Sequence, residues 1–130
     1  MVAFTAIKET TQNNIGVNQN IIFEHVILNE GGAYHAQHGI FVAPVSGYYL
    51  FATSLLHPQI NQPLRGGLMH NGNLVAIAYA TENIWAQGSQ TVVLKITTGD
   101  EVWIKNLDFE HEVVNGDAYS SFSGVILLKL

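Results

Sequence analysis

One long run of the sequence, Gly47–His57, is apolar at odd and even positions alike, and this limits what the chain can fold into. In a β-strand, successive side chains point to opposite faces of the sheet. One face of this run would carry Tyr49, Phe51, Thr53 and Leu55. The other face would carry Tyr48, Leu50, Ala52, Ser54 and Leu56. A strand with one solvated face alternates apolar with polar residues, so both faces of this strand need a cover.

The C-terminal run has the same two-sided character. We expect Phe122, Ile126 and Leu128 on one face and Tyr119, Val125 and Leu127 on the other. One face can fill the space between two sheets, but no amphipathic helix is available to cover the second. A neighbouring copy of the chain is the simplest cover, and overhanging loops are the alternative. Charged residues make up only 12% of the chain against a usual ~25%, which favours a surface hidden by oligomerisation.

The rest of the chain consists of short runs rich in Val, Ile, Phe and Tyr, separated by glycines and tight-turn residues. Such a pattern is typical of many short strands. Asn71-Gly72 between two apolar runs predicts a two-residue hairpin, because a type I′ turn needs positive φ at both central positions. We therefore predict an all-β fold. The expected strands are Val2–Lys8, Ile21–Leu28, Ile40–Val42, Gly47–His57, Leu64–His70, Asn73–Ala78, Gln87–Thr97, Glu101–Asn106 and Ala118–Leu130.

Length and charge exclude several classes of protein. The 130 residues suit one domain, residues 1–130, with no linker or charge block dividing them. Five basic against ten acidic residues give a net charge of −5, which disfavours duplex nucleic acid as a partner. No run of about 18 apolar residues predicts a membrane span. The chain has no cysteine, so disulfides, thiolate zinc sites and thiol nucleophiles are excluded.

A series of aromatic and glycine positions resembles the signature of the C1q globular-head domain. Phe23, Asn29, Tyr34 and Phe41 precede Gly47-Tyr48-Tyr49-Leu50-Phe51 at that family's spacing. Downstream, Gly99-Asp100-Glu101-Val102-Trp103 and Phe122-Ser123-Gly124 are similar to its later strands, and the opening Val2–Ala6 is similar to its first strand. The family often has a further aromatic residue where this chain has Thr53. The resemblance spans the whole chain.

The resemblance implies a ten-stranded antiparallel jelly-roll sandwich that assembles as a trimer, a fold shared with tumour necrosis factor ligands. The signature residues would then be structural and would contact no ligand. They are Phe23, Asn29, Tyr34, Phe41, Gly47, Tyr49, Phe51, Gly99, Trp103, Phe122 and Gly124. Tyr49, Phe51, Phe41 and Phe122 would fill the sandwich or the threefold seam, and Gly47 and Gly124 would allow tight turns or close strand approach.

Two features of better-known members are missing from the sequence. No collagen-like Gly-x-y repeat precedes the domain in this sequence, so we expect either a stand-alone head similar to invertebrate C1q-domain lectins or a piece of a longer chain. Some members hold calcium near the trimer axis, and Glu82 is the only carboxylate of the loop that corresponds here, residues 80–85. Calcium takes about six to eight oxygens, so three symmetry-related Glu82 side chains make a weak site, and we expect no cofactor.

Catalytic motifs are absent from the sequence. No Gly-x-Ser-x-Gly elbow occurs, and Gly66-Gly67 is not followed by the Lys and Ser or Thr of a phosphate loop. We therefore expect a protein that is not an enzyme.

Two polar segments are the candidate ligand-binding regions. His57–Arg65 is long for a hairpin loop and rich in amides, which suit sugar hydroxyl and acetamido groups. Arg65, the only arginine, could pair with a carboxylate or sulfate. Residues 106–117 are acidic. The candidate residues are His57, Gln59, Asn61, Arg65, Asp108, Glu110, His111 and Asn115. The alternative is a Pro-stiffened turn in the first segment and a solvated loop in the second.

These observations and the resemblance together favour a secreted, homotrimeric module that recognises glycans or microbial surface components in innate immunity. Presenting three weak sites at once would raise its affinity. The alternative is a trimerisation or signalling head that engages a protein receptor or assembles a larger chain.

Overall fold

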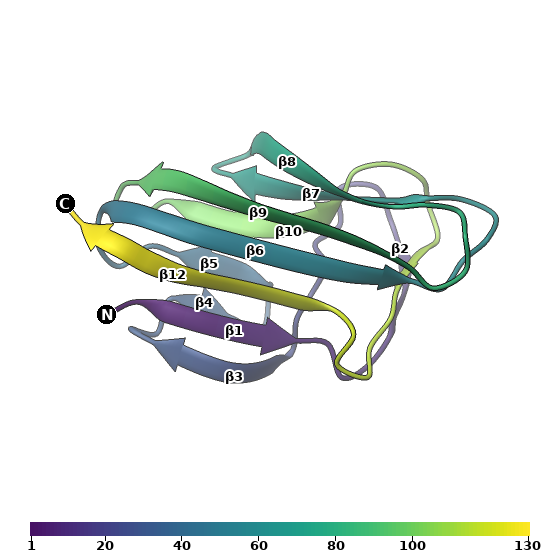
Figure 1. Ribbon diagram of the computed structural model, residues 1–130, viewed down its shortest axis with the longest axis horizontal. Coiled ribbons are helices and arrows are strands. Elements are labelled where there is room, and N and C mark those ends of the chain that lie inside the picture. The colour runs from purple at the N-terminus through teal and green to yellow at the C-terminus, as the bar shows by residue number, and fades with distance from the viewer.

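The computed structural model describes residues 1–130, and strands are its only regular secondary structure. Two five-stranded sheets face each other, and all strand pairs in them are antiparallel (Figure 1). The first sheet has the order β3-β1-β12-β6-β9 and the second the order β4-β5-β10-β7-β8. The strands of the first are β1 (Ala3–Ile7), β3 (His25–Glu30), β6 (Gly47–His57), β9 (Ala86–Ile96) and β12 (Ser121–Lys129). Those of the second are β4 (Tyr34–His35), β5 (Ile40–Val42), β7 (Leu64–His70), β8 (Asn73–Ala80) and β10 (Glu101–Asn106).

The all-β fold predicted from the sequence and the ten-stranded sandwich implied by the resemblance are confirmed, and β5, β6, β7 and β10 have the predicted bounds. A further pair of strands lies outside the two sheets: β2 (Gln12–Ile15) pairs with β11 (Glu112–Val114). Neither was predicted, and nor was the two-residue β4. The predicted Asn71-Gly72 turn is present, with φ of 50° and 86°.

The strand predicted at Ile21–Leu28 begins only at His25 in the structure. Ile21 and Phe23 are completely buried in the core. Ile21 joins β10 through a single hydrogen bond to the Ile104 carbonyl rather than through a ladder. The apolar residues before His25 thus reflect a chain segment that closes one end of the sandwich, and a buried segment without pairing has the same composition as a strand.

The core between the sheets is a cluster of aromatic rings from both layers. Phe4 stacks on Tyr34 at 5.0 Å between ring centroids and meets Phe122 edge-on at 4.9 Å. Phe41 packs edge-on against Phe51 at 5.0 Å. Such contacts add to the free energy gained by burying the rings. The aromatic signature residues Phe23, Tyr34, Phe41, Tyr49, Phe51 and Phe122 therefore fill the sandwich and not a seam between chains.

The polar groups of the signature are also satisfied inside the chain. Asn29 closes the turn before β4, since its amide donates to the Tyr34 carbonyl at 3.0 Å and accepts from the Tyr34 backbone N–H at 3.1 Å. The buried Tyr34 hydroxyl donates to the Phe23 carbonyl. Thr53, where the family often has an aromatic residue, is buried and donates its hydroxyl to the Ser121 carbonyl at 2.9 Å.

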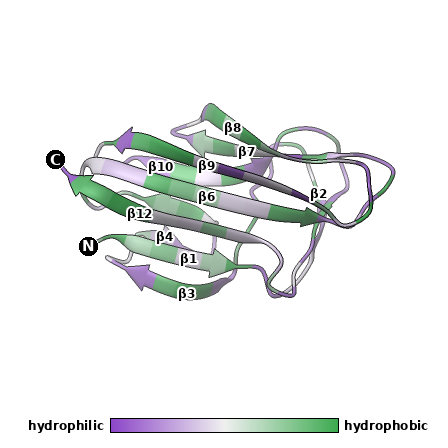
Figure 2. Ribbon diagram, in the orientation of Figure 1, coloured by the Kyte–Doolittle hydropathy of each residue, from purple (hydrophilic) through white to green (hydrophobic).

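The pairing of strands divides the outer face of the first sheet into an apolar and a polar half. In Figure 2 the C-terminal part of β12 is hydrophobic and the first part of β9 is hydrophilic. The apolar half, near the chain termini, comprises Tyr48, Leu50, Val93, Val125, Leu127 and Leu128. We call these six residues the apolar face. Its polar half carries hydroxyls, with the Ser54 and Ser89 side chains 2.7 Å apart.

Leu128 was expected on the inner face with Phe122 and Ile126, and this prediction is wrong. A bulge shifts the pairing between Ile126 and Leu128, so that Leu128 lies opposite the outward-facing Tyr48. A one-residue shift moves every later side chain to the other face. Leu127 and Leu128 are consequently exposed, at 55% and 60%.

Candidate functional site

The two polar segments singled out in the sequence lie together at the end of the sandwich opposite the chain termini (Figure 1). Side chains of the two segments contact each other directly. The Arg65 guanidinium pairs with the Asp108 carboxylate. The Gln59 amide donates to the His111 carbonyl at 3.2 Å, and that of Gln62 to the Glu110 carbonyl at 2.9 Å. Much of the hydrogen-bonding capacity predicted for a ligand is thus used to join the two loops.

His57 was predicted as a ligand residue at an exposed strand end, and the structure corrects this. Its side chain is completely buried, as is that of Glu112, and their nearest nitrogen and oxygen atoms lie 3.0 Å apart. Residues 106–117, for which a solvated loop was the alternative, are not all loop, because Glu112 is the first residue of the strand β11. A buried His–Glu pair serves to hold strands together and is out of reach of a ligand.

The surroundings of His57 favour its doubly protonated form. Its Nε2 faces carboxylate and amide oxygens of Glu112 and Gln59, each at 3.0 Å, and its Nδ1 faces the Thr81 carbonyl at 3.3 Å. All three are acceptors, and only the imidazolium has two donors. Burial by itself lowers the pKa of His57, but the hydrogen bonds to Glu112, Gln59 and Thr81 outweigh it and raise the pKa above its ordinary value.

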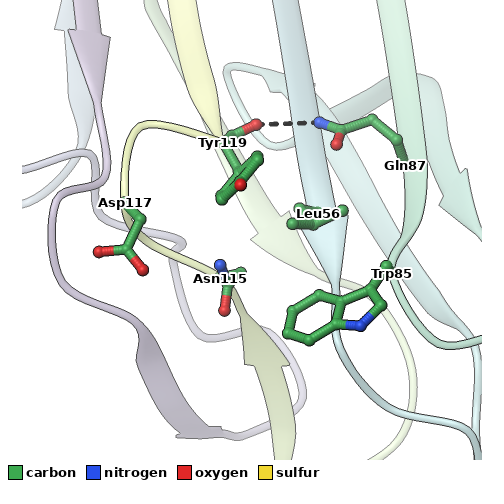
Figure 3. Close-up of a pocket in the computed structure, with 6 residues that line it drawn as sticks. All are labelled: Leu56, Trp85, Gln87, Asn115, Asp117 and Tyr119. Atoms are coloured by element: carbon green, nitrogen blue, oxygen red, sulfur yellow. Dashed lines mark hydrogen bonds between the residues drawn. The ribbon is translucent and has the colours of Figure 1, made fainter.

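A pocket of about 610 Å³ lies beside these loops, where the outer face of the first sheet ends. It is lined by Leu56, Trp85, Gln87, Asn115, Asp117 and Tyr119. Figure 3 shows Trp85 and Asp117 on opposite sides, with Leu56, Asn115 and Tyr119 between them. Trp85 and Tyr119 are 57% and 58% exposed, which is unusual for residues of this size. Of its residues, only Asn115 was among the predicted site residues.

The backbone around the pocket is strained. Trp85 has a φ of 62°, and the consecutive Asp117 and Ala118 have φ of 54° and 67°. A positive φ is rare for a bulky residue such as Trp. Such strain clusters at functional sites, where the surrounding structure enforces it. Two exposed-loop aromatics next to polar residues were the sequence signal for this pocket, but they lie 34 positions apart and only the fold brings them together.

The remaining predicted residues lie nearby without forming a pocket. Asn61 is exposed in the loop after β6, and the His111 ring lies 2.5 Å from the Asn14 side-chain oxygen. Glu82 is exposed on the loop between β8 and β9. No group of three or more His, Asp or Glu side chains is arranged to hold a metal ion.

A search of family models matches residues 3–127 to the C1q domain. The chain belongs to the C1q domain family. It is 35% identical to complement C1q tumor necrosis factor-related protein 3 of Mus musculus and of Homo sapiens, over 98% of its own length. It spans only 52% of the length of these two relatives. Caprin-2 of Danio rerio is 30% identical over 98% of the chain, which covers 14% of that protein.

Solved structures confirm the fold. The globular domain of zebrafish complement 1qA superimposes with a TM-score of 0.81 over 100% of both chains, at 18% identity. Murine APRIL superimposes with a TM-score of 0.75 at 12% identity, over 99% of this chain and 98% of that one. At these identities the likeness extends to the fold alone. The structure contains no helix long and apolar enough to cross a membrane.

Proposed function

We propose that this C1q domain is a non-enzymatic, extracellular recognition head that acts as a homotrimer and binds glycans or microbial surface components. The observation that carries the recognition role is the pocket with its two exposed rings, Trp85 and Tyr119. Concave sites with aromatic walls and a few polar groups are the usual form of a small-ligand site. The amide and carboxylate side chains beside the rings suit a polar ligand such as a sugar.

The homotrimer is supported by the apolar face. Its six residues lie side by side on strands β6, β9 and β12, and four of them are exposed in the single chain. Contiguous apolar patches on soluble proteins mark interaction sites. Because the patch lies near the termini and the pocket at the other end, three chains packed through it would present three pockets from one assembly. Binding one surface through several pockets raises avidity without a new contact.

A glycan array probed with the purified protein tests the proposal. We expect binding to a restricted set of sugars, and we expect it to weaken strongly when the protein is monomeric. The monomer can be produced with Val93→Glu, which places a charge on the exposed part of the apolar face. Leu74→Glu is the matched control, since Leu74 is 50% exposed on β8 of the other sheet.

A signalling or assembly head is the second candidate, and the relatives named for tumor necrosis factor favour it. In that case the trimer would engage a protein, and the array would show no sugar binding. A protein with the mass of three chains and an empty array supports this alternative, whereas sugar binding by the trimer supports the proposal.

A further inference from the structure

We propose that the pocket between Trp85 and Tyr119 binds a ligand through a primary ammonium group, and that this ligand is an amino sugar. The inference rests on the proposed function, since it names the kind of sugar that the pocket would select. Sialic acids, which are anionic, and N-acetylated sugars, which are neutral, are the classes it argues against.

The first argument is the hydrogen-bonding state of the pocket. Gln87 has already used both of its amide hydrogens, donating to the Ser54 hydroxyl at 2.7 Å and to the Tyr119 carbonyl at 3.0 Å. The second of these bonds is drawn in Figure 3. The side-chain amide oxygen of Gln87 keeps its lone pairs free to accept a hydrogen bond. The Asp117 carboxylate forms no hydrogen bond or ion pair within the chain, so both of its oxygens are also free acceptors.

An ammonium group is the natural complement of such a pocket, because it has three donors and no acceptor. A hydrogen bond from an ammonium to a carboxylate is also stronger than one between neutral groups. The Trp85 indole N–H and the Tyr119 hydroxyl could donate to the carbonyl of an acetamido group, but such a group has no positive charge to pair with the Asp117 carboxylate. A carboxylate ligand would face Asp117 directly and be repelled.

The second argument is the charge around the rings. None of the six residues that line the pocket is Lys, Arg or His. The one arginine of the chain is paired with Asp108, and Lys8 is buried against Gln12 and the Ile22 carbonyl. The electron-rich faces of Trp and Tyr attract cations, Trp most strongly. With no basic side chain to occupy these faces, Trp85 and Tyr119 remain available to a cation from the ligand.

The third argument is that Trp85 and Asp117 are held on opposite sides of the pocket. Ala86 donates to the Asn83 carbonyl at 3.1 Å, which closes the turn carrying Trp85. The backbone N–H of Asp117 donates to the Glu9 carbonyl and that of Ala118 to the Lys8 carbonyl, both at 2.9 Å. The loop of Asp117 is therefore anchored to the end of β1. A pocket with fixed walls loses little conformational entropy when a ligand binds.

A pair of matched oligosaccharides tests the ligand class. A glucosamine tetramer and its fully N-acetylated counterpart differ only in the free amino groups. Titrations can follow the emission of Trp85 in a Trp103→Phe background, since the chain has two tryptophans. We expect the glucosamine tetramer to bind about tenfold more tightly, and its affinity to fall several-fold between 0.05 M and 0.5 M salt because the contact is ionic.

Two variants test the site. We expect Asp117→Asn to weaken glucosamine binding about fivefold, and Trp85→Ala to do so at least as strongly. Because Trp85→Ala removes the fluorescent reporter, calorimetric titration measures the affinity of both variants and of the parent protein. Asn tolerates the left-handed backbone at position 117, so that variant should fold normally even if Trp85→Ala does not. Glu82→Gln and Tyr79→Ala are the matched controls, because both residues are exposed and neither lines the pocket.

The outcomes separate this inference from the proposed function. Sugar binding that survives Asp117→Asn and Trp85→Ala, or a preference for the N-acetylated tetramer, overturns the inference and leaves glycan recognition intact. An array with no sugar bound at all overturns the proposed function. Tighter binding of a lysine tetrapeptide than of the glucosamine tetramer overturns the amino sugar as the source of the ammonium group.

Discussion

At the scale of single residues, the buried His57–Glu112 pair holds three segments at the loop end of the sandwich. His57 ends β6, Glu112 begins β11, and the His57 ring also reaches the Thr81 carbonyl before the loop of Trp85. The second oxygen of Glu112 is buried with no hydrogen-bond partner. Removing one partner of a buried ion pair is strongly destabilising, since the other charge is left uncompensated.

This pair predicts a stability that depends on pH. The pKa of His57 is raised in the folded chain, so its contribution is complete below the ordinary value of about 6.5 and is lost as pH rises through the folded pKa. We expect Glu112→Gln to cost about 3 kcal/mol at pH 6 and to abolish most of this pH dependence. Urea unfolding at pH 5 to 9 measures both. The exposed Glu82→Gln should stay within about 0.5 kcal/mol of the parent, and an equal loss in both variants contradicts the role of the pair.

The residue-scale features were the least predictable from sequence. A histidine at a strand end reads as exposed, and only the pairing of β11 with β2 buries His57 against Glu112. The pocket was missed for a similar reason, because Trp85 and Tyr119 come from separate loops. For the signature residues, the resemblance implied a structural role and left open whether the aromatic ones fill the sandwich or the threefold seam. Alternation assigns Tyr49 and Phe51 to one face of β6 but does not say which face points inward.

At the scale of elements, β12 is held close to the aromatic core by Gly124. A Cβ at this position would lie 2.7 Å from the rings of both Phe4 and Phe51. Those rings are packed against Tyr34, Phe41 and Phe122, so they have little room to move. The glycine thus sets the distance between the strand and the core.

We therefore expect Gly124→Ala to destabilise the fold by about 1–3 kcal/mol through overpacking. Ser123→Ala, on the neighbouring outward-facing position of β12, should change stability by less than about 0.5 kcal/mol. Thermal or urea unfolding of both variants checks this. Equal stability of Gly124→Ala and the parent would show that β12 can retreat from the rings without loss.

The element bounds show where sequence patterns are informative. The strands β6 and β10 were predicted at their observed limits, because the apolar run and the strand pairing have the same extent in both. β2 and β11 are short and polar, and they pair outside the sandwich, so no hydrophobic period marks them. No sequence pattern marks the bulge in β12 either, although this bulge is the reason that Leu128 faces outward.

At the scale of the whole molecule, the two-sided apolar character of β6 and β12 anticipated the apolar face. The structure shows that the inner faces of these strands are fully used by the core, so the outward residues cannot be covered from within. No loop of the chain lies over Val93, Leu127 or Leu128, which are 55% to 60% exposed. A further copy of the chain is the cover that the proposed function requires.

Light scattering of the purified protein, with and without a calcium chelator, tests this central claim most directly. We predict a mass of three 14.2 kDa chains in both conditions, a single-chain mass for Val93→Glu, and an unchanged trimer for Leu74→Glu. Dissociation on chelation would contradict our expectation of no cofactor and would assign a calcium-binding role to the three Glu82 side chains. A single-chain mass for the parent protein would contradict the homotrimer and the avidity on which its proposed function depends.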